Sequence, residues 1–206
     1  MKVMLVIDHP YGAKAWDNTP HRRSFTVALA HAAQIGLAAA GHDVDLVDLH
    51  ADGFNPVMSA DELTAWRLGA PSPDPLAADY QRRLLAADYL VLAFPIWWEA
   101  MPAATKGFID KVVTKGVAYR EGSGLRPMTN ATKLRGVTLI TVMSTPALLY
   151  RALFASAISK ILLRGTFRKI GVGNLTWLSH ASVDTKPLPA RQTMLNAVEA
   201  RFARLN

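Results

Sequence analysis

The chain has 206 residues, of which 50% are hydrophobic and 19% are charged, and its mean hydropathy is +0.13. This composition excludes a disordered chain, and the length suits a single domain over residues 1–206. The absence of cysteine excludes disulfides, thiolate metal sites, iron–sulfur clusters and cysteine nucleophiles. The sequence shows no export signal and no run of about 20 apolar residues, so we expect a cytoplasmic protein.

The formal net charge of +7 is distributed unevenly along the chain. Residues 1–100 carry 7 basic and 12 acidic side chains, whereas residues 101–206 carry 16 basic and 4 acidic ones. A basic face of this kind suits a nucleic acid, an anionic membrane, a phosphorylated cofactor or an acidic partner. Nucleic acid ranks last among these, because the aromatic and basic residues are not interleaved on one surface.

Short apolar runs alternate with helical periodicity along the chain. The apolar runs predict five strands, and apolar spacings of three and four predict helices between them. In chain order we expect a strand at 3–7, a helix at 24–40, a strand at 43–49, helices at 61–68 and 76–87, a strand at 89–94, a helix at 103–113, a loop at 114–135, a strand at 137–143, a helix at 148–163, a strand at 175–183 and a helix at 189–205. Gly41 is expected to cap the first helix in a left-handed conformation.

This alternation predicts an α/β fold, a three-layer α/β/α sandwich with right-handed crossovers. Only five strands are expected and no G-x-G-x-x-G follows the first, so we predict a flavodoxin-like, five-stranded parallel sheet of order 2-1-3-4-5. Ligands of such sheets bind beyond the carboxyl ends of the strands, at the switch point between the first and third strands. Three loops are therefore expected to carry the function: residues 8–24, 94–102 and 143–150.

The first of these loops leads into a helix that starts near Ser24. Backbone amides of the first helical turn, with the hydroxyls of Ser24 and Thr26, would favour an anion such as a phosphate. His9 would add a charge-assisted hydrogen bond, and Arg22 and Arg23 would add more distant positive charge. Alternatively, Ser24 and Thr26 only cap the helix.

The second loop holds two adjacent tryptophans, Trp97 and Trp98, between Pro95 and Pro102. Turns that face solvent usually hold polar residues, so this aromatic bulk needs an explanation. A planar ring system would stack on the tryptophans and bond to the backbone amides between the prolines. Alternatively, the tryptophans fill the inside of the loop or form a contact between subunits, because tryptophan is also enriched at interfaces.

No metal site is predicted. On an expected strand, alternation points Asp43 and Asp45 outward, and with Asp48 they have no closing ligand. The histidines lack the spacing of a zinc site.

Together these features resemble those of the flavin-dependent NAD(P)H:quinone oxidoreductases. The resemblance rests on Asp-His-Pro after the first strand, Ser-Phe-Thr at the first helix, Gly-Phe-Asn-Pro at 53–56, and above all AADYLVLAFPIWWEAMPAATKGFIDKVVTKGVAY at 86–119. It covers most of residues 2–175. It implies a homodimer that binds FAD or, alternatively, FMN; the segment Phe54–Pro56 resembles that of FAD-using members.

The resemblance also implies roles for the matching residues. The phosphate and ribityl chain of the flavin would contact His9, Ser24, Phe25 and Thr26. The isoalloxazine would lie against Pro95, Ile96, Trp97 and Trp98. A second flavin-contacting loop would comprise Val142, Met143, Ser144 and Thr145. Tyr150 would be the catalytic tyrosine, and Tyr119 would close the substrate pocket of the partner subunit.

Several features depart from the family pattern. The first loop is about nine residues longer, as a lid or a specificity insert would be. Residues Val142–Thr145 stand where many relatives have Thr-Thr-Gly-Gly, and Thr26 stands where Asn is usual. Ser156 replaces the catalytic histidine of some members, so we expect no His–Tyr proton relay.

The activity that the resemblance implies is hydride transfer from NAD(P)H to the flavin and then to a quinone-like acceptor, with ping-pong kinetics. Positive charge near the site favours NADPH over NADH. One alternative is a flavodoxin-type electron carrier, although such carriers are acidic and this chain has a pI of about 9.9. Another is a flavin-binding regulatory subunit of a membrane transporter, which would dock through the basic half of the chain.

Overall fold

The computed structural model describes residues 1–122 and 128–206, so part of the loop predicted at 114–135, residues 123–127, lies outside the described residues. Five parallel strands form one sheet in the order β2-β1-β3-β6-β7. They are β1 (Lys2–Ile7), β2 (Asp43–Asp48), β3 (Tyr89–Pro95), β6 (Gly136–Met143) and β7 (Asn174–Ala181). The predicted α/β fold and the 2-1-3-4-5 order of its five sheet strands are confirmed.

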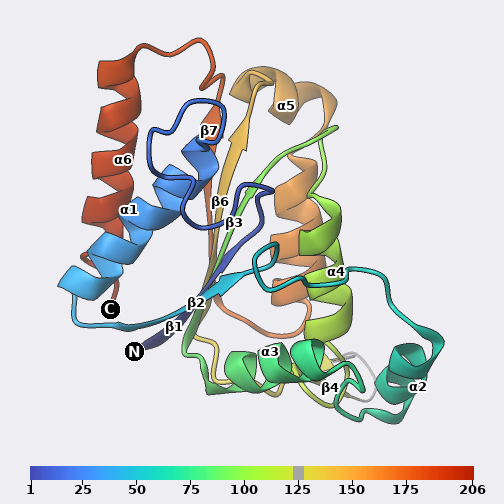
Figure 1. The fold of residues 1–206 in the computed structure, drawn as a ribbon. Helices are drawn as coiled ribbons and strands as arrows, with labels where there is room; N and C mark the ends of the chain where they lie inside the picture. Colours follow the sequence, from blue (N-terminus) through green and yellow to red (C-terminus); the bar gives the residue numbers. More distant parts are fainter. Residues whose placement is uncertain (123–127) are drawn as a thin grey trace.

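Helices cover both faces of this sheet and make three layers (Figure 1). One face carries α1 (Phe25–Ala39) and α6 (Leu188–Phe202). The other carries α3 (Pro75–Ala86), α4 (Ala103–Val112), α5 (Ala147–Leu153) and a π-helix, η1 (Ser159–Arg168), while α2 (Ala60–Leu68) extends beyond α3 and α4.

Burial on both faces explains why the strands are continuous apolar runs. Along β1, Val3, Leu5 and Ile7 pack in the cluster that includes α1 and α6, whereas Met4 and Val6 pack in the cluster on the other face. The contact between α1 and α6 requires a glycine, because a Cβ on Gly36 would lie 2.2 Å from the carbonyl oxygen of Glu199.

The predicted ends of α1 are confirmed. The Ser24 hydroxyl accepts the Val27 N–H at 3.3 Å, as an N-cap does. At the other end Gly41 has a φ of 75°, and its N–H donates to the carbonyl oxygen of Ala38. The N-terminus of α1 is thereby fixed at the carboxyl edge of the sheet.

The single helix predicted at 148–163 is wrong. The chain forms α5, breaks where Ala155 and Ser156 adopt φ angles of 51° and 55°, and continues as η1. Tyr150 stabilises the break, because its carbonyl oxygen accepts the Ser156 N–H and its hydroxyl accepts the Ile158 N–H. Apolar residues continue at helical spacing through this segment, so the periodicity contains no sign of the break.

The segment predicted as a loop at 114–135 also contains structure that the sequence analysis missed. Two strands, β4 (Tyr119–Glu121) and β5 (Met128–Asn130), pair antiparallel outside the main sheet. At three residues each, they are too short to produce a recognisable alternation.

A buried lysine joins the helices on the α4 side of the sheet. The Lys111 side chain is 1% exposed, and its ammonium group lies 3.0 Å from Glu62 Oε1 and 2.8 Å from Asp74 Oδ2. Burial alone would raise the pKa values of both carboxyl groups, but hydrogen bonds from Lys111 and from backbone N–H groups hold these pKa values below their ordinary range. The cluster therefore ties α2, α3 and α4 together in its charged form.

Replacing Lys111 by methionine leaves two carboxylates without their counterion. We expect Lys111→Met to lower the free energy of unfolding by about 3–5 kcal/mol in urea denaturation. Lys106→Met is the matched control on the same helix, because Lys106 forms only an exposed pair with Asp110, and it should cost less than about 1 kcal/mol.

The same cluster predicts a pH dependence of stability. Since the folded-state pKa values of Glu62 and Asp74 are lowered, their stabilisation is present above the unfolded values of 4.5 and 3.8 and is lost as the pH falls through the folded values. In Lys111→Met this acid-induced loss should be smaller. Equal losses of stability in the unmodified protein and in Lys111→Met would contradict the attribution of this pH dependence to the Lys111 cluster.

Candidate functional site

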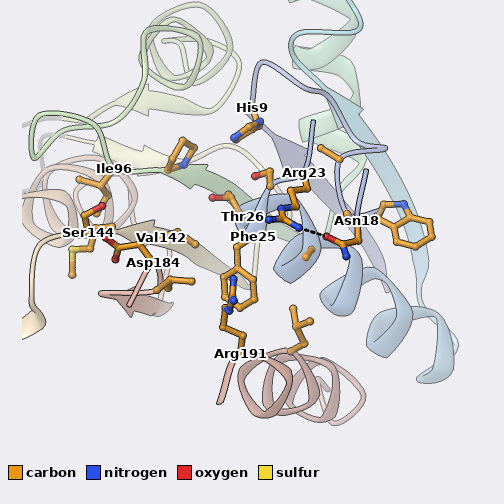
Figure 2. Close-up of a pocket in the computed structure, with 18 of the residues that line it drawn as sticks. His9, Asn18, Arg23, Phe25, Thr26, Ile96, Val142, Ser144, Asp184 and Arg191 are labelled. Carbon is orange, nitrogen blue, oxygen red and sulfur yellow. Dashed lines mark hydrogen bonds between the residues drawn. The ribbon is translucent and has the colours of Figure 1, made fainter. Parts of the chain in front are cut away.

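A cavity of about 950 Å³ opens at the carboxyl ends of β1, β3 and β6. This is the switch point at which the sequence predicted ligand binding. Figure 2 shows side chains from the three predicted loops converging on it, with a further contribution from α6. Of the predicted flavin-contacting residues, those that line it are His9, Ser24, Phe25, Thr26, Pro95, Ile96, Trp97, Val142, Met143 and Ser144.

The N-terminus of α1 forms one wall of the cavity. Ser24 and Thr26 are buried there and Phe25 is half-buried. The Ser24 hydroxyl accepts one of the four N–H groups that the first turn of a helix leaves unpaired. The other N–H groups and the positive end of the helix dipole favour an anion at this wall.

His9 lies beside this wall, two residues after the end of β1. Burial and the neighbouring His50 lower the pKa of His9, and the opposing effects of Asp8 and Asp48 are smaller. These effects favour the neutral imidazole, whose Nδ1 accepts the Tyr11 N–H at 3.2 Å. An anion bound next to the ring would favour its protonated form.

The second loop forms a tight turn at the opposite wall. Trp97 and Ala100 exchange two backbone hydrogen bonds of 3.0 Å. Between them, Trp98 and Glu99 have φ angles of 49° and 61°, as in the type I′ turns that normally contain Asn and Gly. Positive φ at such residues costs about 1 kcal/mol or more each and is typical of functional sites.

The turn separates the roles of the two tryptophans. Trp97 lines the cavity and is 46% exposed, whereas Trp98 is fully exposed and does not line it. The Ile96 N–H already donates to the carbonyl oxygen of Val142, and the Trp97 N–H donates to that of Ala100. This stretch thus offers apolar and aromatic contact rather than the backbone donors that the sequence analysis expected at these two positions.

The third loop is joined to the second through Glu99. Val142, Met143 and Ser144 line the cavity, but Thr145 does not, because its hydroxyl donates to Glu99 Oε1 at 2.7 Å. Within residues 1–122 and 128–206, the other carboxylate oxygen of Glu99 is buried without a hydrogen-bond partner. Glu99 therefore holds the two loops together instead of facing solvent.

The two predicted tyrosines lie away from the cavity. Tyr150 is fully buried, and its hydroxyl donates to the carbonyl oxygen of Glu99 and accepts the Ile158 N–H, both at 3.1 Å. Burial raises the pKa of this hydroxyl. Tyr119 is buried in β4 and does not line the cavity either. Their predicted roles toward a substrate stay predictions.

An extension of the cavity toward α6 was not predicted from the sequence. Arg191 reaches from α6 toward Phe25, and Arg23 donates to Asn18 Oδ1 at 2.7 Å (Figure 2). The long first loop is held against α1 by Trp16, whose ring stacks on His31 at 4.2 Å. No local pattern indicated this extension, because it is formed by segments about 170 residues apart in the chain.

The described part of the chain contains no group of three or more His, Asp or Glu side chains arranged to hold a metal ion. None of its helices combines the length and the apolar character needed to cross a membrane.

We expect the His9 ring to titrate below pH 6.5 in an NMR titration of the ligand-free protein, because burial and His50 disfavour its charged form. With a lowered folded-state pKa, its neutral form contributes stability above pH 6.5 that is lost as the pH falls. His50→Gln removes the neighbouring imidazole and should raise the His9 midpoint. A midpoint at or above 6.5 in the unmodified protein would contradict this description of the site.

A five-stranded sheet of this order, with a cavity at its switch point, defines a flavodoxin-like fold. The chain belongs to the protein family whose description is "flavodoxin-like fold", because the model of that family matches residues 1–202.

The curated relatives include proteins named NAD(P)H oxidoreductase or NAD(P)H dehydrogenase (quinone) and others named ribosyldihydronicotinamide dehydrogenase (quinone). The chain is 34% identical over 106 residues to the uncharacterized NAD(P)H oxidoreductase YcaK of Escherichia coli, covering 52% of this chain and 54% of that protein. It is also 34% identical over 115 residues to NAD(P)H dehydrogenase (quinone) 1 of Rattus norvegicus, covering 48% and 41%. The matches thus span about half the length of these relatives.

Solved structures extend the similarity over the whole fold. A putative quinone reductase from Klebsiella pneumoniae is 26% identical with a TM-score of 0.79, over 98% of this chain and 83% of that one. An FMN-dependent NADH-azoreductase from Bacillus anthracis, solved in complex with FMN, is 13% identical with a TM-score of 0.76 over 98% of both chains. The second likeness shows the fold alone.

Proposed function

We propose that the protein is a flavin-dependent NAD(P)H:quinone-type oxidoreductase, which transfers a hydride from NAD(P)H through a bound flavin to a quinone-like acceptor. The observation that carries this proposal is the cavity at the switch point, which brings together all the predicted flavin-contacting residues except Trp98 and Thr145. The relatives that are named NAD(P)H oxidoreductase or NAD(P)H dehydrogenase (quinone) support the same class of reaction.

The side chains present fit a flavin. An anion-favouring helix N-terminus with His9 at one wall suits the phosphate. The apolar strip of Pro95, Ile96 and Trp97 at the other wall suits a planar ring, and the Ser144 hydroxyl offers a hydrogen bond beside it. The flavin, when bound, supplies the two-electron chemistry.

The protein contributes binding, orientation and proton control to this reaction. The α1 amides and a protonated His9 hold the anionic end, so binding should be accompanied by proton uptake at His9. The strained turn at Trp98 and Glu99 holds Trp97 against the ring position. One cavity serves both NAD(P)H and acceptor, which would bind in turn and give ping-pong kinetics.

The extension of the cavity favours FAD over FMN. Beyond the α1 N-terminus it is lined by Trp16 and Asn18 of the long loop, by Arg23, and by Arg191 of α6. Within the described residues, Nε of Arg191 is buried without a hydrogen-bond partner. A second phosphate and an adenosine group, which FAD has and FMN lacks, would use these cationic and aromatic side chains. The same positive charge favours NADPH over NADH.

Exposed apolar side chains on consecutive elements support the proposed homodimer. They lie on α5 and at its end, on η1 and in the Trp97–Ala100 turn, and are Trp98, Leu148, Leu149, Leu153, Phe154 and Ile161. Exposed apolar side chains concentrated in this way are typical of an interaction site. A second copy would cover these side chains and would bring its own Tyr119 to the neighbouring cavity.

Anaerobic titration with NADPH tests the proposed reaction. The protein reconstituted with FAD should lose its visible flavin absorption on addition of one equivalent of NADPH and recover it on addition of a quinone. The same sample should sediment at twice the chain mass of 22.4 kDa. Flavin binding without bleaching would favour an electron carrier or a transporter regulatory subunit, and no flavin binding would contradict the proposal.

Flavin preference can be tested at Arg191. Arg191→Gln should weaken FAD binding by about tenfold or more, because a hydrogen bond to a charged group is worth about 1.5–3 kcal/mol, while FMN binding changes by less than about threefold. Arg201→Gln on the same helix is the control, since Arg201 does not line the cavity and bonds to Thr176. Fluorescence titration gives both affinities, and equal effects on FAD and FMN would contradict the FAD assignment.

A further inference from the structure

Asp8 is a buried carboxylate between the two loops that form opposite walls of the cavity. It follows β1 directly, is 1% exposed, and precedes the cavity residue His9. Its side chain is not among those that line the cavity. A buried carboxylate is unfavourable unless hydrogen bonds compensate it, so its partners reveal what it holds in place.

One oxygen of Asp8 binds the start of α4. Oδ2 accepts both the backbone N–H and the hydroxyl of Thr105, each at 2.6 Å. Pro102, the N-cap residue of α4, provides no side-chain hydrogen bond. Asp8 therefore supplies, from a strand far away in sequence, the acceptor that an N-cap side chain usually supplies, and it places negative charge at the positive end of the helix.

The other oxygen connects Asp8 to the end of β2. Oδ1 accepts a hydrogen bond from Nε2 of His50 at 2.9 Å. Next to it, the Asp48 carboxylate accepts the backbone N–H groups of Ala13, in the first loop, and of His50. A continuous set of hydrogen bonds thus runs from the first loop through Asp48, His50 and Asp8 to α4.

The start of α4 determines where the second loop lies. Only Met101 and Pro102 separate the Trp97–Ala100 turn from the helix. The backbone pairing between β1 and β3 ends with the bond from the Asp8 N–H to the carbonyl oxygen of Ala93, before either loop begins. Beyond that point the Asp8 side chain binds Thr105 at the start of α4 and so connects the segment around His9 to the loop that carries Trp97.

We propose that Asp8 is a positioning residue that holds the second ligand-binding loop at a fixed distance from the first through the N-terminus of α4. The proposal deepens the proposed function, on which it rests for the identity of the ligand. It predicts that loss of the carboxylate loosens residues 97–106 locally and weakens flavin binding, although Asp8 touches no ligand.

The test combines hydrogen–deuterium exchange of the flavin-free protein with flavin titration. Asp8→Asn keeps the shape of the side chain but removes its charge. Thr105→Val keeps the shape of that side chain but removes its hydroxyl group. Asp88→Asn is the matched control, because Asp88 also accepts a backbone N–H, that of Lys2 at 2.8 Å, but at the opposite edge of the same sheet.

Asp8→Asn should speed exchange in residues 97–106 by about tenfold and weaken FAD binding by about tenfold, with smaller effects in Thr105→Val. Thr105→Ser, which retains the hydroxyl, should behave as the unmodified protein, and Asp88→Asn should change neither readout. A visible absorption spectrum of bound flavin that changes shape in Asp8→Asn, but not in Asp88→Asn, would support altered positioning.

Two results would overturn the proposal: unchanged exchange at 97–106 in Asp8→Asn, or a uniform increase over the whole chain, which indicates a general structural role. If Asp8→Asn does not fold, Thr105→Val decides by the same two criteria. If the unmodified protein binds no flavin, the proposed function fails, whereas the exchange measurement still decides whether Asp8 holds the loop.

Discussion

The parallel register of β1, β3 and β6 is the constraint on which the candidate site depends. Ile7 pairs with Ala93, and Ala93 pairs with Ile140, so the three central strands run in register, and β3 and β6 continue only as far as Pro95 and Met143 beyond the level at which β1 ends. Their loops must therefore leave the sheet side by side, although they come from three distant parts of the chain. Helix α1, which starts from the first of these loops, adds an anion-favouring terminus at the same edge.

Polar side chains beneath the loops convert this common edge into a shaped cavity. Glu99 joins the second loop to the third through Thr145, and Asp8 joins the first loop to the second through Thr105. Both carboxylates lie behind the cavity wall and neither lines it. Backbone pairing between β1 and β3 has ended at this level, so the Asp8 bonds set the spacing between the first and second loops. The second and third loops are joined by the Glu99 bond and also by the backbone bond from Ile96 to Val142. Together these bonds determine how far apart the walls stand, and hence which planar ligand fits between them.

Features of the fold that depend on burial could be predicted from the sequence. Strands covered on both faces must be apolar throughout, so runs such as Val3–Ile7 identify β1, and Gly41 identifies the end of α1 through its left-handed conformation. The break at Ala155 and Ser156 could not be predicted in this way. The break depends on the hydrogen bond from the Ile158 N–H to the Tyr150 hydroxyl, and no local sequence pattern indicates that bond.

The residues of the candidate site also divide into those that could be predicted from the sequence and those that could not. Residues next to strand ends, such as His9 and Ile96, line the cavity because the topology brings these strand ends together, and their contact with a ligand stays a prediction. Arg191 was missed because its position depends on how α6 packs against α1, which no local pattern encodes. The turn at Trp98 was also unforeseen, since neither Trp nor Glu is typical of a type I′ turn.

A crystal structure of the protein grown with FAD would show directly whether the cavity at the switch point holds the flavin. We expect the flavin phosphate at the N-terminal amides of α1 beside His9, the ring against Ile96 and Trp97, and the adenosine half toward Arg191. A flavin bound elsewhere, or an empty cavity at saturating FAD, would contradict the proposed function of this site.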